Sequence, residues 1–199
     1  MEGWKLDQNF SSAEGAVRFG ISGTGADVVL VHGTPWSSYT WHRLIPFLSE
    51  QYRVHFYDFI GYGQSEKRPS QNVSLDVQGR LLADLLTHWG LKKPKIIAHD
   101  FGGAASLRAH LLHGCDFGSL QLIDVVALAP WGSPFFAHVQ QHEEAFSGVP
   151  DYIHLAIVQA YIRGAMHKLL DETQFDKLVE PWVTENGKAA FYRQIAQAD

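Results

Sequence analysis

The sequence predicts an α/β protein with a mainly parallel sheet, helices on both faces of the sheet, and a helical addition. Three observations indicate this class. Short apolar runs rich in β-branched residues alternate with segments whose apolar residues recur at helical spacing. A sharp switch from strand to helix occurs within KIIAHDFGGAA, residues 95–105. After Trp131 the strand-like runs stop and only helical patterns follow.

Five strands and three helices are predicted in the first part of the chain. The run DVVLV, residues 27–31, is apolar almost throughout, as in a parallel strand buried on both faces. Ser74 is a predicted N-cap for the second helix. The predicted strands cover residues 16–21, 27–31, 52–57, 95–98 and 122–128, and the predicted helices cover 39–48, 74–89 and 102–112.

The second part of the chain is predicted to hold helices alone. The patterns favour helices at 137–146, 151–169, 171–179 and 186–198, punctuated by prolines and glycines. We therefore predict two units, an α/β core over residues 1–131 and a helical cap segment over residues 132–199.

Composition limits the classes of function. Of the 199 residues 46% are hydrophobic and 19% are charged, so the chain can bury a sizeable core. The net charge of −5 and the lack of a basic run argue against a nucleic-acid partner. The N-terminus lacks the features of a signal peptide, and no apolar run approaches the ~18 residues of a membrane span. We expect a cytoplasmic protein that acts on a small molecule without a membrane partner; the oligomeric state stays open.

The segment Ala98–Gly102 places Asp100 between small residues two positions away on each side. This spacing is typical of a nucleophile held on a tight, strained turn before a helix, whose N-terminus favours negative charge. An aspartate is already ionised at neutral pH and needs no base before it attacks an alkyl carbon. A histidine-activated water would then hydrolyse the resulting ester. The alternative is that Asp100 only caps the helix.

Three motifs together resemble the α/β-hydrolase family, in the branch with an aspartate nucleophile: the epoxide hydrolases and the haloalkane or haloacetate dehalogenases. HGTPWSSYTW, residues 32–41, is similar to the family's His-Gly-x-Pro oxyanion loop. YDFIGYGQSEKR, residues 57–68, is similar to its Gly-rich turn, and HDFGG, residues 99–103, to its nucleophile turn. The resemblance covers roughly residues 27–131, and the helical segment follows where the family inserts its cap.

The resemblance implies a role for several residues. Asp100 would be the nucleophile, and the backbone N–H groups of Thr34 and Phe101 would form the oxyanion or halide pocket. Pro35 would shape the loop on the substrate side. Tyr152 resembles the cap tyrosine with which epoxide hydrolases protonate the ring oxygen, although a core tyrosine is an equal alternative. No metal or cofactor is implied.

Two further parts of the family's machinery are not found in the sequence. The family's histidine base follows the cap, and its acid partner follows one of the two strands that flank the cap. The stretch VVALAPWGSP, residues 125–134, holds no carboxylate, and none of the eleven histidines stands where the base is expected. The sequence is therefore similar to about the first two-thirds of such an enzyme.

The substrate class has three alternatives. Haloalkane dehalogenases use a tryptophan and an asparagine where this chain has Phe101 and Thr34, which favours an epoxide hydrolase. A halogenated acid stays open if Arg108 or Arg163 binds its carboxylate. The remaining alternative is a catalytically incomplete, hydrolase-like fragment or binding protein.

Overall fold

The computed structural model describes residues 4–128 and 132–199 and is built on a six-stranded sheet in the order β1-β2-β4-β3-β5-β6. β1 (Gln8–Ser12) and β2 (Gly15–Ser22) are antiparallel to their neighbours. β3 (Ala26–Val31), β4 (Tyr52–Tyr57), β5 (Lys95–His99) and β6 (Ser119–Ile123) are parallel. The predicted fold class is confirmed. β1 was not predicted, because Phe10 is the one apolar residue in its sequence QNFSS.

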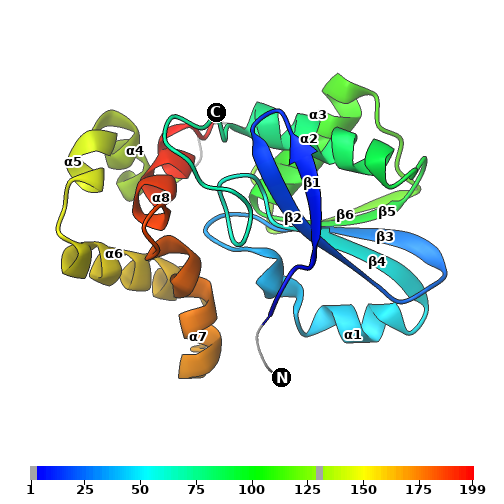
Figure 1. Cartoon of the computed structure of the whole chain (residues 1–199), viewed down its shortest axis with the longest axis horizontal. Coiled ribbons are helices and arrows are strands. Elements are labelled where there is room, and N and C mark those ends of the chain that lie inside the picture. The colour runs from blue at the N-terminus through cyan, green and yellow to red at the C-terminus, as the bar shows by residue number, and fades with distance from the viewer. Residues whose placement is uncertain (1–3, 129–131) are drawn as a thin grey trace.

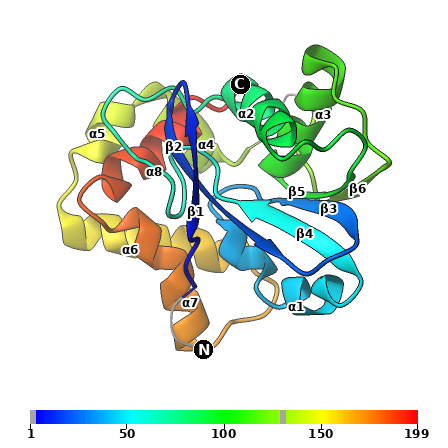
Figure 2. The ribbon, with the colours of Figure 1, turned by 45° about the vertical axis from the view of Figure 1, so that its right-hand side comes forward.

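Helices cover both faces of the sheet. α1 (Leu44–Ser49) lies on one face, and α2 (Leu75–His88) and α3 (Phe101–His113) lie on the other (Figures 1 and 2). Successive residues of β3 serve both layers. Val28 and Leu30 join the apolar cluster of α1, whereas Val29 and Val31 join the cluster of α2 and α3. This double burial explains the unbroken apolar run of β3.

The predicted helix at 39–48 is divided in two. A 3₁₀ helix, η1 (Ser38–Trp41), comes first, and α1 begins only at Leu44. Pro46 is the physical reason, because a proline lacks an N–H and its ring clashes with the carbonyl four residues earlier. A proline is tolerated within the first turn of a helix, which is where Pro46 lies in α1.

The last predicted strand was placed too late in the chain. Residues 122–128 were predicted, but β6 spans Ser119–Ile123, because it pairs with β5 from Lys95↔Ser119 to His99↔Ile123 and ends where β5 ends. The apolar residues that follow pack elsewhere. A Cβ at Gly103 of α3 would lie 2.3 Å from the side chain of Val125, so Val125 rests against the start of that helix.

The described residues after 131 form helices beside one end of the sheet, as predicted (Figure 1). The predicted helix at 137–146 is divided at His142, and the predicted helix at 151–169 ends at Gly164. These elements are α4 (Pro134–Gln141), α5 (Glu143–Ser147), α6 (Asp151–Gly164), α7 (Glu172–Val179), the 3₁₀ helix η2 (Glu180–Trp182) and α8 (Gly187–Ala196).

The residues at and after the end of α8 return to the core. The side chain of Gln197 accepts a hydrogen bond from the Val73 N–H at 2.7 Å. The carboxylate of Asp199 accepts one from the Leu75 N–H at 3.0 Å and pairs with Arg108. Within the described part of the chain, no helix is both long and apolar enough to cross a membrane.

Candidate active site

Asp100 lies on a strained turn between β5 and α3. Its backbone has φ +53° and ψ −122°, a conformation that L-residues with a side chain rarely adopt. The Asp100 N–H donates to the Ile123 carbonyl at 3.2 Å, and the Asp100 carbonyl accepts from the Gly103 N–H at 2.9 Å. A Cβ at Gly102 would lie 2.3 Å from the Val31 carbonyl oxygen. The small residue after the turn therefore lets α3 approach β3 closely.

Two backbone N–H groups converge on one oxygen of the Asp100 carboxylate. Thr34 donates to Oδ1 at 2.7 Å, and Phe101 donates to the same Oδ1 at 2.6 Å. Thr34 comes from the loop after β3, and Phe101 is the first residue of α3. The structure thus brings together three of the five residues that the resemblance pointed to. Both bonds use Oδ1, so neither of these donors occupies Oδ2.

Opposing influences act on the pKa of Asp100. Burial raises the pKa of its carboxyl group, and this effect outweighs the lowering by the Thr34 and Phe101 N–H bonds. Of the nearby side chains, His99 lowers this pKa and the negative charge of Asp124 raises it. The ionised form of Asp100 is therefore less favourable here than in water.

A cavity of about 410 Å³ opens beside Asp100, between the core and the helical segment. Tyr161 of α6 lines it from the opposite side. Burial and the negative charge of Asp100 both raise the pKa of the Tyr161 hydroxyl, so it stays protonated at neutral pH and can donate a proton. The lining residues are Thr34, Asp100, Phe101, Val126, Gly132, Ser133, Phe136, Ala160, Tyr161, Gly164 and Ala165.

Tyr152 and Pro35 are not among the described residues that line this cavity. Tyr152 is 72% exposed and lies on α6 about two and a half turns before Tyr161, hence on the opposite side of the helix. Sequence alone could not choose between the two tyrosines, because the choice depends on which side of α6 faces the core. Pro35 is buried, and its carbonyl accepts from the Trp182 indole N–H at 2.8 Å.

Asp124 was not among the predicted site residues, because the last strand was predicted to cover residues 122–128 and would have contained it. β6 ends at Ile123, so Asp124 is the first residue after the strand that precedes the helical segment. Its φ of +45° is again unusual for a residue with a side chain. Its proximity to Asp100 makes it a candidate acid, and a correct strand end would have revealed it.

Two other conspicuous polar residues have structural roles. His32 is buried, with Nδ1 2.9 Å from the Gly33 carbonyl oxygen and Nε2 accepting from the Phe59 N–H. Asp58 accepts from the N–H groups of Ser38 at 2.7 Å and Gln64 at 2.6 Å. Both side chains brace the loops that surround the site.

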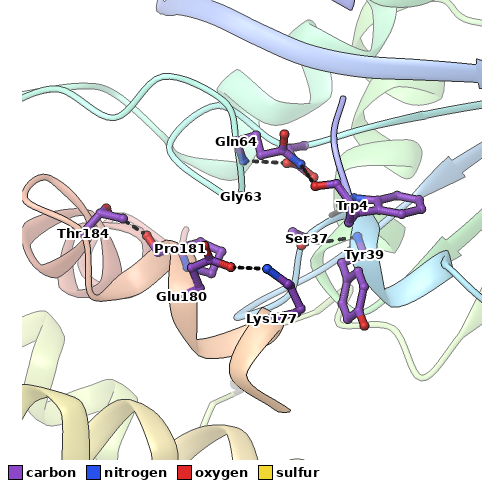
Figure 3. Close-up of a pocket in the computed structure, with 10 residues that line it drawn as sticks. Trp4, Ser37, Tyr39, Gly63, Gln64, Lys177, Glu180, Pro181 and Thr184 are labelled. Atoms are coloured by element: carbon purple, nitrogen blue, oxygen red, sulfur yellow. Dashed lines mark hydrogen bonds and ion pairs between the residues drawn. The ribbon is translucent and has the colours of Figure 1, made fainter. Parts of the chain in front are cut away.

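A separate cavity of about 270 Å³ lies where the Gly-rich turn faces η2 (Figure 3). Its most prominent charges, Lys177 and Glu180, pair with each other at 2.9 Å (Figure 3). Asp58 lines it too, but its carboxylate is engaged as described above. Among residues 4–128 and 132–199, no cluster of three His, Cys, Asp or Glu side chains is placed to hold a metal ion.

The comparison with protein families agrees with the fold. Residues 28–150 match the family described as "alpha/beta hydrolase fold", which is more than half of the chain. The chain belongs to this family.

Known members of the alpha/beta hydrolase fold family resemble the chain to different extents. An alpha/beta hydrolase fold protein from Burkholderia ambifaria has a solved structure that is 46% identical, with a TM-score of 0.95, over 98% of this chain and 72% of that one. The soluble epoxide hydrolase of Corynebacterium sp. (strain C12) is 38% identical over 85 residues. Haloalkane dehalogenase 2 of Mycobacterium tuberculosis (strain ATCC 25618 / H37Rv) is 29% identical over 98 residues. The match to the epoxide hydrolase covers 43% of this chain and 29% of that protein, and the match to the dehalogenase covers 49% and 34%.

The cavity of this alpha/beta hydrolase lacks two kinds of side chain among its described residues. No histidine lines it, and neither does an arginine or a lysine. Arg108 pairs with Asp199, and Arg163 lies over the ring of Phe175 at 4.4 Å. The two arginines considered for binding a substrate carboxylate are therefore used elsewhere.

Proposed function

We propose that this chain performs the nucleophilic step of an epoxide hydrolase. Oδ2 of Asp100 attacks a ring carbon of the epoxide while Oδ1 is held by the Thr34 and Phe101 N–H groups. A carbon–oxygen bond forms, the ring carbon–oxygen bond breaks, and its electron pair goes to the ring oxygen. Tyr161 donates its proton to that oxygen. The product is a hydroxyalkyl ester of Asp100, and water returns a proton to the tyrosinate.

One observation carries the choice of an epoxide: Tyr161, whose hydroxyl is an O–H donor, lines the same cavity as Asp100. A halide would instead require N–H donors. The indole N–H of Trp182 already donates to the Pro35 carbonyl, and no described side chain lining the cavity carries an N–H. The absence of cations from that lining also argues against a halogenated acid.

The second half of the reaction would hydrolyse the ester. Water attacks the ester carbonyl carbon, and Oδ1 becomes the oxyanion where Thr34 and Phe101 already donate. By the family resemblance, Asp124 would orient a histidine base. No described histidine lines the cavity, so we expect the ester to persist on this chain.

A haloalkane dehalogenase is the second candidate, supported by the 29% identical relative from Mycobacterium tuberculosis. The attack by Oδ2 would be the same, with halide as the leaving group and no need for an acid. The two reactions therefore differ in their dependence on Tyr161.

The test compares a 1,2-epoxyalkane with a 1-bromoalkane of equal length, with adduct formation followed by mass spectrometry. We expect the epoxide to add its mass to the peptide that contains Asp100. Tyr161→Phe should slow this about 100-fold, because a positioned acid contributes about that much. Tyr152→Phe, on the exposed side of the same helix, is the matched control and should react like wild type.

Two other outcomes of this comparison would contradict the epoxide hydrolase proposal. Reaction with the bromoalkane but not with the epoxide, unchanged by Tyr161→Phe, would assign the dehalogenase. Failure of both compounds to react would favour a hydrolase-like binding protein.

The pH dependence of ester formation follows from the raised pKa of Asp100. Only the ionised carboxylate attacks, so the rate should be constant at neutral pH and fall as the pH drops through that pKa. The midpoint should lie above the ~3.9 of an exposed aspartate. Rates of adduct formation in buffers of constant ionic strength measure it. A midpoint at or below ~3.9 would show that the N–H bonds lower the pKa of Asp100 by as much as burial raises it, or by more.

A further inference from the structure

Gln194 of α8 joins three parts of the molecule at one buried amide. It is 1% exposed, and its Oε1 accepts hydrogen bonds from the Thr34 hydroxyl at 2.7 Å and the Tyr62 hydroxyl at 2.8 Å. Thr34 belongs to the loop after β3, and Tyr62 belongs to the Gly-rich turn. A side chain of the helical segment thus anchors two core loops.

Thr34 also contacts Asp100, the proposed nucleophile. The backbone N–H of the same residue donates to Asp100 Oδ1 at 2.7 Å. Pro35, the next residue, is also bonded to the helical segment, because the Trp182 indole N–H donates to its carbonyl. The position of one oxyanion donor therefore depends on contacts made by the helical segment.

Packing does not explain a glutamine at this position. Its Nε2 is buried, and none of the described residues provides it with an acceptor. Burying such a group is unfavourable, whereas an apolar side chain of equal size would fill the space without that cost. Exchanging the amide's nitrogen and oxygen would still bond the same two hydroxyls. The contribution of Gln194 is therefore the link to these hydroxyls.

We propose that Gln194 is a positioning residue that links the position of the helical segment to the geometry of the oxyanion hole formed by the Thr34 and Phe101 N–H groups. It holds the Thr34 side chain, which fixes the Thr34 N–H against Oδ1 and so directs Oδ2 toward the substrate. This inference rests on the proposed function of Asp100. It adds that correct placement of α8 is a condition for the reactive geometry of the core.

Gln194→Met tests the link, since methionine has similar size and its thioether sulfur is only a weak acceptor for the two hydroxyls. With a 1,2-epoxyalkane, we expect the maximal rate of ester formation to fall about tenfold, the effect of losing one well-placed hydrogen bond. The half-saturating concentration should change less than twofold. The control is Gln197→Met, which lies just after the same helix and also bonds the core, but at Val73 and the Gln71 carbonyl. It should lower thermal stability while leaving the rate within twofold of wild type.

Thr34→Val removes the same link from the other side while keeping the backbone N–H. If the two residues act together, the double variant Thr34→Val/Gln194→Met should be no more than about twofold slower than either single variant. Thr34→Val also covers the case in which Gln194→Met fails to fold. If the rate losses of the two single variants multiply in the double variant, the two residues act independently and the coupling is wrong. The coupling is also wrong if Gln194→Met forms the ester as fast as Gln197→Met does.

A measurement without substrate separates this inference from the proposed function. We expect amide hydrogen exchange at Thr34 to be about tenfold faster in Gln194→Met than in wild type, and unchanged in Gln197→Met. Faster exchange without any adduct in wild type would support the link and reject the nucleophile. Unchanged exchange at Thr34 would overturn the link, whatever the activity.

Discussion

Replacement of Asp100 by asparagine is expected to abolish the covalent adduct while the fold is kept. The neutral amide is a far weaker nucleophile than the carboxylate, so ester formation should fall by more than ~10³-fold. The asparagine carbonyl can still accept from the Thr34 and Phe101 N–H groups, which hold the present carboxylate at 2.7 and 2.6 Å. Peptide mapping after incubation with a 1,2-epoxyalkane measures the effect. An adduct of full yield in Asp100→Asn would show that Asp100 is only a helix cap.

The same substitution should raise stability at neutral pH. The folded-state pKa of Asp100 is raised, so the native state binds its proton more tightly than the unfolded chain does. Stability is therefore lost as the pH rises through the unfolded pKa of ~3.9, and the loss is complete above the folded pKa. Asparagine avoids this loss and should raise the melting temperature at pH 7.

Thermal unfolding at two pH values provides the control for this effect. At pH 3 the aspartate is largely protonated in both states, so Asp100→Asn and wild type should unfold at nearly the same temperature. A stability gain of equal size at both pH values would mean that the charge of Asp100 is not its source.

Of the substitutions proposed for this chain, Gly102→Ala is expected to cause the largest loss in the free energy of unfolding. A Cβ at this position would lie 2.3 Å from the Val31 carbonyl oxygen and 2.6 Å from that of His32. Both are backbone atoms and cannot rotate away, so α3 would have to move off β3. We expect a loss of ~3–5 kcal/mol in the free energy of unfolding, measured by urea denaturation.

Gly164→Ala is the matched control for that loss. Gly164 also lies in a helix, at the end of α6, but a Cβ there would meet no atom within 4 Å. We expect its free energy of unfolding to stay within about 0.5 kcal/mol of wild type. Equal effects of the two substitutions would contradict the close approach of α3 to β3.

The sequence by itself determined the parts of the site that depend on local sterics. A tight turn between a buried strand and a helix needs small flanking residues, and Ala98 and Gly102 mark the turn around Asp100. The alternation of apolar runs predicted the parallel strands, because a strand buried on both faces must be apolar throughout. The tight turn at Asp100 and the fold class were therefore within reach of the sequence, whereas Thr34 and Phe101 were expected as donors only from the resemblance to the α/β-hydrolase family.

Only the tertiary structure decided which residues of other elements meet that turn. Pairing with β5 ended β6 at Ile123 and so placed Asp124 beside Asp100. The rotation of α6 turned Tyr161 toward the cavity and Tyr152 toward solvent. Gln194 bonds Thr34 across a separation of 160 residues. Such contacts depend on strand register and on how helices pack, and neither property is encoded in the short-range pattern of any one segment.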